Sequence, residues 1–93
     1  MDFKEIQGKE VIDKGARLIG KVSDIEFDTN TWKITHICVD VNKNVVDDLG
    51  LKKPMIGNAK ATIPIEIIDT TSDRVLLKNE SVEDLKKVMK NKS

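Results

Sequence analysis

Residues 8–28 indicate the architecture of this chain, and they read Gly8-Lys9-x-Val11-x3-Gly15-x3-Ile19-Gly20-Lys21-Val22-x-Asp24-x3-Asp28. The segment predicts a short strand at Val11-Ile12, a glycine turn, and a long strand over residues 17–27. Within the long strand the apolar residues change phase around Ser23-Asp24, which a strand of strict period two would not do. A β-bulge or a bend near Gly20 accounts for the change, and small barrels need such bends to close.

A second strand follows, so residues 17–41 predict a β-hairpin. Its turn is expected at residues 28–31, where Asp and Asn side chains can hydrogen-bond their own backbone. The second strand is expected over residues 32–41, and whether Trp32 belongs to the core or to a contact surface is left open. Alternation along this strand predicts two faces, with Ile37, Val39 and Val41 on one and Ile34, His36 and Cys38 on the other.

The rest of the chain is less regular. Residues 42–60 predict a loop with one helical turn ended by Gly50. Residues 61–69 alternate apolar and polar side chains around Pro64, which predicts an edge strand or two short strands. A closing strand is expected at residues 74–78. A C-terminal helix is expected at about residues 81–90, with an apolar stripe at helical spacing made of Val82, Leu85 and Met89.

The 93 residues suffice for one domain, and none of the bulk properties indicates a second core. The expected fold is mainly β: a small antiparallel barrel of about six strands, spanning about residues 6–78, with one C-terminal α-helix. The 16 acidic and 16 basic side chains cancel, and only Arg17 and Arg74 are arginines. This balance argues against a nucleic-acid binder. No apolar run approaches the ~18 residues of a membrane span, and no signal peptide is visible, so the expected location is the cytoplasm.

Candidate chemistry is sparse. Cys38 is the only cysteine, which excludes an intrachain disulfide and a cysteine-based zinc cage. His36 and Cys38 share a strand face, but about 6.5–7 Å separates such positions and no third group orients them. Asp24, Glu26 and Asp28 alternate along a strand without the loop that binds calcium. The sequence therefore predicts a protein that is not an enzyme, with no catalytic residue, cofactor or metal.

Apolar residues outside the expected barrel are the candidate partner contacts. In the 42–60 loop they could mark a contact surface or simply cap the barrel. The C-terminal helix could lay its stripe against the barrel or against a second subunit, and its lysines could complement the helix dipole or touch RNA. The predicted partner-binding residues are Leu51, Met55, Ile56, Val82, Leu85 and Met89.

The pattern from Gly8 through Val41 resembles the PRC-barrel family, named for the photosynthetic reaction centre H subunit. The family includes the C-terminal domain of a ribosomal small-subunit maturation factor. The matching positions are Gly8-Lys9, Val11, Gly15, Ile19-Gly20-Lys21-Val22, Asp24, Asp28, Thr31, Val39-Asp40-Val41, Ile63-Pro64 and Asp73-Arg74-Val75-Leu76-Leu77. Trp32 departs from the pattern, because the family often has glycine after the hairpin threonine. The run Trp32-Lys33-Ile34-Thr35 resembles the stand-alone archaeal members instead.

The resemblance implies a protein-interaction adaptor or scaffold. Some stand-alone archaeal members are implicated in cell division, where they link barrel proteins to a membrane anchor of the division ring. The expected partner is then a division-ring or membrane-anchor protein, and the chain is expected to form a homodimer or homo-oligomer without inserting into the membrane. The alternative is an RNA-processing or ribosome-maturation accessory factor that binds a ribosomal protein.

Overall fold

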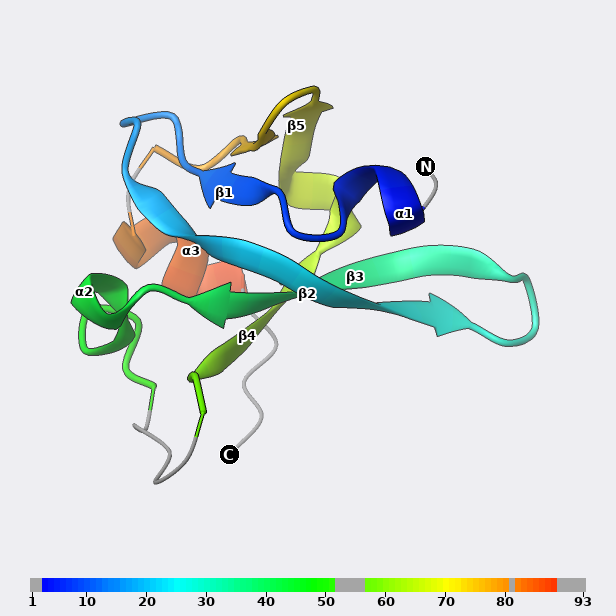
Figure 1. Cartoon of the computed structure of the whole chain (residues 1–93), viewed down its shortest axis with the longest axis horizontal. Helices are drawn as coiled ribbons and strands as arrows, with labels where there is room; N and C mark the ends of the chain where they lie inside the picture. The colour runs from blue at the N-terminus through cyan, green and yellow to red at the C-terminus, as the bar shows by residue number, and fades with distance from the viewer. Residues whose placement is uncertain (1–2, 52–56, 81, 89–93) are drawn as a thin grey trace.

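The computed structural model describes residues 3–51, 57–80 and 82–88, which form six strands, three short α-helices and a 3₁₀ turn (Figure 1). In chain order these are α1 (Phe3–Ile6), β1 (Glu10–Ile12), β2 (Leu18–Asp28), β3 (Lys33–Val41), α2 (Lys43–Val46), β4 (Lys60–Pro64), η1 (Ile65–Ile67), β5 (Ile68–Thr71), β6 (Val75–Leu77) and α3 (Val82–Val88). The predicted hairpin, the strand broken at Pro64, the closing strand and the C-terminal helix are confirmed. The sequence did not predict α1.

The strands form one curled sheet in the order β4-β3-β2-β1-β6-β5. Its two edge strands, β4 and β5, are joined by the three residues of η1, so the sheet bends far enough to bring its ends together. Among the described residues no ladder joins β4 to β5, and the structure is an open curled sheet rather than a fully closed barrel. The sheet is mainly antiparallel, and the one described exception to the predicted antiparallel pairing is that β1 and β6 pair in parallel. A parallel pair needs a long connection, and here the whole of β2–β5 supplies it.

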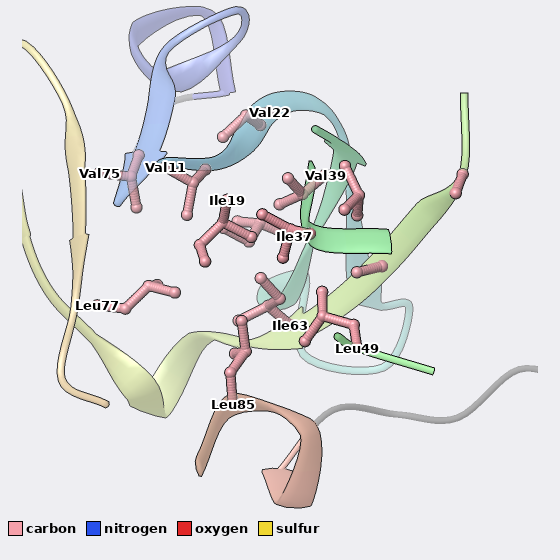
Figure 2. Close-up of a cluster of buried hydrophobic side chains, with 14 of the residues drawn as sticks. Val11, Ile19, Val22, Ile37, Val39, Leu49, Ile63, Val75, Leu77 and Leu85 are labelled. Atoms are coloured by element: carbon pink, nitrogen blue, oxygen red, sulfur yellow. The ribbon is translucent and has the colours of Figure 1, made fainter. Parts of the chain in front are cut away.

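The core lies inside the curl of the sheet, and Figure 2 shows side chains from five strands and α3 converging there. Val11, Ile37, Ile63 and Leu77 are each fully buried, although they come from four different strands. Leu85 of α3 is also fully buried against them. At Leu85, α3 therefore packs against the sheet of its own chain. Packing against the barrel was one of the two predicted alternatives, and packing against a second subunit was the other.

At the base of the β2–β3 hairpin the two strands leave no room for a side chain on Gly20. A Cβ atom on Gly20 would lie 2.0 Å from the carbonyl oxygen of Asp40 on the neighbouring strand. Glycine is the one residue that permits this approach. The predicted bulge is found two residues later, where the register of β2 against β3 shifts between Val22 and Asp24. Together these features bend the hairpin around the core.

The segment after β3 covers one end of the core. Asn42 caps α2, its side chain accepting a hydrogen bond from the Asn44 backbone (3.2 Å). One further turn ends at Gly50, which has a left-handed φ of +71°, and the predicted helical turn is confirmed. The buried side chains of this segment are Val45, Val46 and Leu49. The described part of the 42–60 loop thus caps the core, as one of the two predicted alternatives had it.

Candidate interaction surface

The structure describes the side chains of two of the predicted contact residues, Leu51 and Leu85. Leu51 is half-buried and packs against the core, and Leu85 has no exposed area. A residue without exposed surface cannot touch a partner in this arrangement. Val82 opens α3, and Met55, Ile56 and Met89 lie outside the described residues. Leu85 therefore lies in the core and Leu51 against it, and the remaining four predicted contacts stay predictions.

The candidate chemical groups form polar contacts of the sheet. The Nδ1 atom of His36 lies 2.9 Å from the Thr35 hydroxyl and 3.6 Å from a carboxylate oxygen of Glu26. Within residues 3–51, 57–80 and 82–88, no group of three or more His, Cys, Asp or Glu side chains could hold a metal ion. A surface hollow beside the hairpin base has Lys21, Asp40 and Lys43 as its charged lining residues.

The most exposed large apolar side chains of the hairpin lie at its far end, which extends beyond the rest of the fold (Figure 1). Phe27 is 46% exposed and Trp32 is 74% exposed. Their rings are stacked, with centroids 5.5 Å apart and planes 25° from parallel. The half-buried Ile34 is the cross-strand partner of Phe27. We call Phe27, Trp32 and Ile34 the aromatic tip.

The aromatic tip continues the core face of the hairpin outward. Ile25 pairs with the fully buried Ile37, and Phe27 follows Ile25 on the same face of β2. The register shifts again between Glu26 and Phe27, which leaves Thr35 as an extra residue on β3. This bulge turns Ile34 to the face of Ile37, so its predicted place beside His36 and Cys38 is wrong. The result is one apolar strip along the hairpin, and Phe27 and Trp32 at its outer end are exposed.

The turn that carries Trp32 is fixed by its polar residues. The Asp28 carbonyl accepts a hydrogen bond from the Trp32 backbone N–H (2.6 Å) and the Asp28 side chain accepts one from the Asn30 N–H (2.8 Å). The predicted Asx-type turn is thereby confirmed, but it extends to Trp32, and β3 begins at Lys33. The fourth turn residue, Trp32, must adopt a left-handed φ of +58°.

A tryptophan in this conformation is costly. A left-handed backbone costs a residue with a Cβ roughly 1–2 kcal/mol, and glycine avoids that cost. Stacking on Phe27 returns about 0.5–1.5 kcal/mol, but with 74% of Trp32 exposed little further burial is gained. The structure thus answers the question that the sequence left open, since Trp32 lies on the surface. Its place directly after an Asx turn was the one signal that could have indicated this.

The outer hairpin also differs from the whole chain in charge. Residues 24–36 carry three carboxylates against one lysine, a net charge of −2 with His36 neutral, whereas the whole chain is neutral. Asp24 and Asp28 are exposed on the strand that leads to the tip. The surface is therefore an aromatic end on an acidic stem.

A scan against protein-family models matches the PRC-barrel domain over residues 1–83 of this chain. A search of curated proteins finds no match. No helix in the described ranges is both long enough and apolar enough to cross a membrane.

Proposed function

The chain belongs to the PRC-barrel family, and from this premise we propose that it is a non-enzymatic adaptor that self-associates and binds another protein. The observation that carries the proposal is the aromatic tip, in which Phe27 and Trp32 are exposed together at the end of a projecting hairpin. Aromatic residues are enriched at protein–protein interfaces and contribute much of their binding energy. The backbone of this turn favours glycine, yet the residue there is Trp32. A partner that contacts the indole ring would account for the tryptophan.

The setting we propose is archaeal cell division. It is supported by the likeness of Trp32-Lys33-Ile34-Thr35 to the stand-alone archaeal members of the family, and the partner is then a division-ring or membrane-anchor protein. Self-association would use another surface, for which the edge strand β4 is a candidate because β3 is its one neighbour in the described sheet. An edge strand offers unpaired backbone groups to a second chain.

The alternative is an accessory factor of RNA processing or ribosome maturation. It is supported by the maturation-factor members of the family and by Lys86 and Lys87, which are exposed on α3. In this case the partner is a ribosomal protein. Any direct contact with RNA phosphates would weaken steeply with added salt, because bound counterions are released on binding.

The deciding experiment is affinity capture of the tagged chain from its native host, with and without ribonuclease, followed by mass spectrometry. Recovery of division-ring or membrane-anchor proteins after nuclease treatment supports the adaptor. Recovery of ribosomal proteins supports the alternative. A chain that stays monomeric in sedimentation and recovers no protein contradicts the adaptor proposal.

A further inference from the structure

We propose that the aromatic tip inserts into an apolar pocket of a partner protein, and that lysine and arginine side chains rim this pocket. The inference rests on the proposed function, because it names the surface and the chemistry of the partner for the same adaptor. It assigns binding to Phe27, Trp32 and Ile34, none of which is among the contact residues that the sequence indicated.

The aromatic tip is a narrow projection that can enter a pocket, and not a flat surface. The two rings stack on each other at the end of a two-stranded stem, so they are held in place before binding. Preorganised aromatic side chains lose little conformational freedom when they enter a pocket. The bulge at Thr35 adds Ile34 to the same face, which makes the end of the hairpin apolar on one side.

The exposed area of the tip is too small for a dimer in which two tips meet face to face. An aromatic side chain buries about 150–250 Å², so Phe27 and Trp32 together expose roughly 300 Å². Two tips face to face would cover roughly 600 Å², whereas stable interfaces cover about 1,200–2,000 Å². The tip is too small to form a dimer by itself, and it has the size of the central cluster of a larger interface.

The charge of the stem determines the rim of the pocket. Residues 24–36 carry a net charge of −2, and the exposed carboxylates of Asp24 and Asp28 lie on the face of β2 opposite Phe27, where the rim of a pocket that surrounds the hairpin end would meet them. Complementary interfaces place opposite charges across from each other and penalise like charges. The same carboxylates repel RNA phosphates and anionic lipid headgroups, so stacking on bases or insertion into an anionic bilayer is disfavoured.

The test compares four baits, namely the wild-type chain, Trp32→Gly, Phe27→Thr and Val88→Ser. Trp32→Gly removes the ring and suits the left-handed turn, so the fold is retained and a thermal melt verifies it. Val88→Ser is the matched control, since it removes from α3 an apolar side chain that is 43% exposed, close to the 46% of Phe27. Phe27→Thr is a second tip variant with a strand-compatible residue. Proteins captured from host lysate by each bait are quantified, and the protein enriched by the wild type is purified as the probe.

Affinities of the wild type and the variants are measured by isothermal titration calorimetry, and 5-fluorotryptophan at Trp32, the only tryptophan, gives one ¹⁹F resonance that reports on the tip in every chain that keeps this residue. We expect the probe to shift this resonance. Trp32→Gly and Phe27→Thr should weaken binding of the probe at least about 30-fold, whereas Val88→Ser should leave the affinity unchanged. The double variant Asp24→Asn, Asp28→Asn, which retains the oxygen that caps the turn, should slow association several-fold and flatten its salt dependence.

Capture of the same protein at equal strength by Trp32→Gly overturns the inference and leaves the adaptor proposal intact. If no bait recovers a protein, both fail. A ¹⁹F shift caused by poly(U) RNA, by anionic phosphatidylserine vesicles or by raising the concentration of the chain alone also overturns it, in favour of that occupant. A probe whose binding strengthens when Asp24 and Asp28 are neutralised contradicts the basic rim.

Discussion

Gly20 and Trp32 lie at opposite ends of the same hairpin and show opposite relations between residue and backbone. At the base, the Asp40 carbonyl approaches so closely that only glycine fits, and the chain has glycine. At the tip, φ is +58°, glycine again suits the backbone, and the chain has tryptophan. The base follows the demands of the fold, whereas the tip departs from them.

The difference indicates where the fold ends and a contact begins. A residue that opposes its local conformation persists where something other than local stability favours it. The Gly20 contact is needed to bend the sheet over the core. Trp32 does nothing comparable for the core, since it is mostly exposed. Substitutions at either end of the hairpin test this difference between Gly20 and Trp32.

The largest effect is expected for Gly20→Ala. The new Cβ would lie 2.0 Å from a backbone oxygen that cannot move without disturbing the β2–β3 ladder, so we expect a loss of about 4 kcal/mol in the free energy of unfolding. Urea denaturation followed by circular dichroism measures it. Gly8→Ala is the control, because Gly8 has a left-handed φ of +79° and no atom near the added Cβ, and it should cost only about 1 kcal/mol. Equal losses would refute the steric account.

Leu85→Ala tests the same contrast on α3, where a buried and an exposed apolar residue lie three positions apart. Leu85 is fully buried, so its truncation should cost about 3 kcal/mol through lost burial and a cavity. Val88→Ala, at a residue 43% exposed, should cost less than about 0.5 kcal/mol. A small loss for Leu85→Ala would mean that α3 does not pack on the sheet.

Much of the fold follows from local sequence patterns. Periodicity, or a turn residue within about ten positions, predicts four features of the fold. These are the hairpin, the split strand at Pro64, the bulge beside Ser23-Asp24 and the helix with Leu85. The parallel pairing of β1 with β6 is not predicted in this way, because its two strands lie some sixty residues apart and nothing local specifies which strands meet. The four-residue α1 is too short to show a period.

The candidate surface was missed for two physical reasons. Tryptophan is largely buried on average, so the pattern could not place Trp32 outside. The bulge at Thr35 moves Ile34 to the opposite face of the sheet from the one that strict alternation predicts. A single extra residue in a strand leaves no recognisable pattern in the sequence. The predicted contacts rested on apolar residues of irregular segments, and the described ones among them, Leu51 and Leu85, pack against or within the core.

Two substitutions at Trp32 separate strain from stacking. Trp32→Ala keeps a Cβ in the left-handed turn and loses the contact with Phe27, so we expect a loss of about 1 kcal/mol. Trp32→Gly loses the same contact but relieves the strain, and its unfolding free energy should lie within about 0.5 kcal/mol of the wild type. Urea midpoints of the two variants measure the difference. If Ala were as stable as Gly, the left-handed turn would not be strained.

Ala16 offers a similar test away from the tip, because its φ is +64° in the turn after β1. The turn is held by Asp13, whose carbonyl accepts from the Ala16 N–H (3.0 Å) and whose side chain accepts from the Arg17 N–H (3.0 Å). Ala16→Gly should stabilise the fold by about 0.5 kcal/mol, since relief of strain exceeds the added chain entropy. A lower melting temperature for this variant would contradict the expectation.

The smallest effect concerns Asp40, whose carbonyl meets Gly20 and whose side chain accepts a hydrogen bond from the Lys60 ammonium (2.8 Å). This bond raises the pKa of Lys60 above the ordinary value of 10.5. Because the folded pKa exceeds the unfolded one, the stabilisation is complete below pH 10.5 and disappears as the pH rises through the folded value. The pair is solvent-exposed, so it contributes less than about 0.5 kcal/mol. Lys60→Met should remove this alkaline component from urea denaturation profiles, and an unchanged difference between variant and wild type from pH 8 to 11.5 would show that the bond adds nothing to the hairpin base.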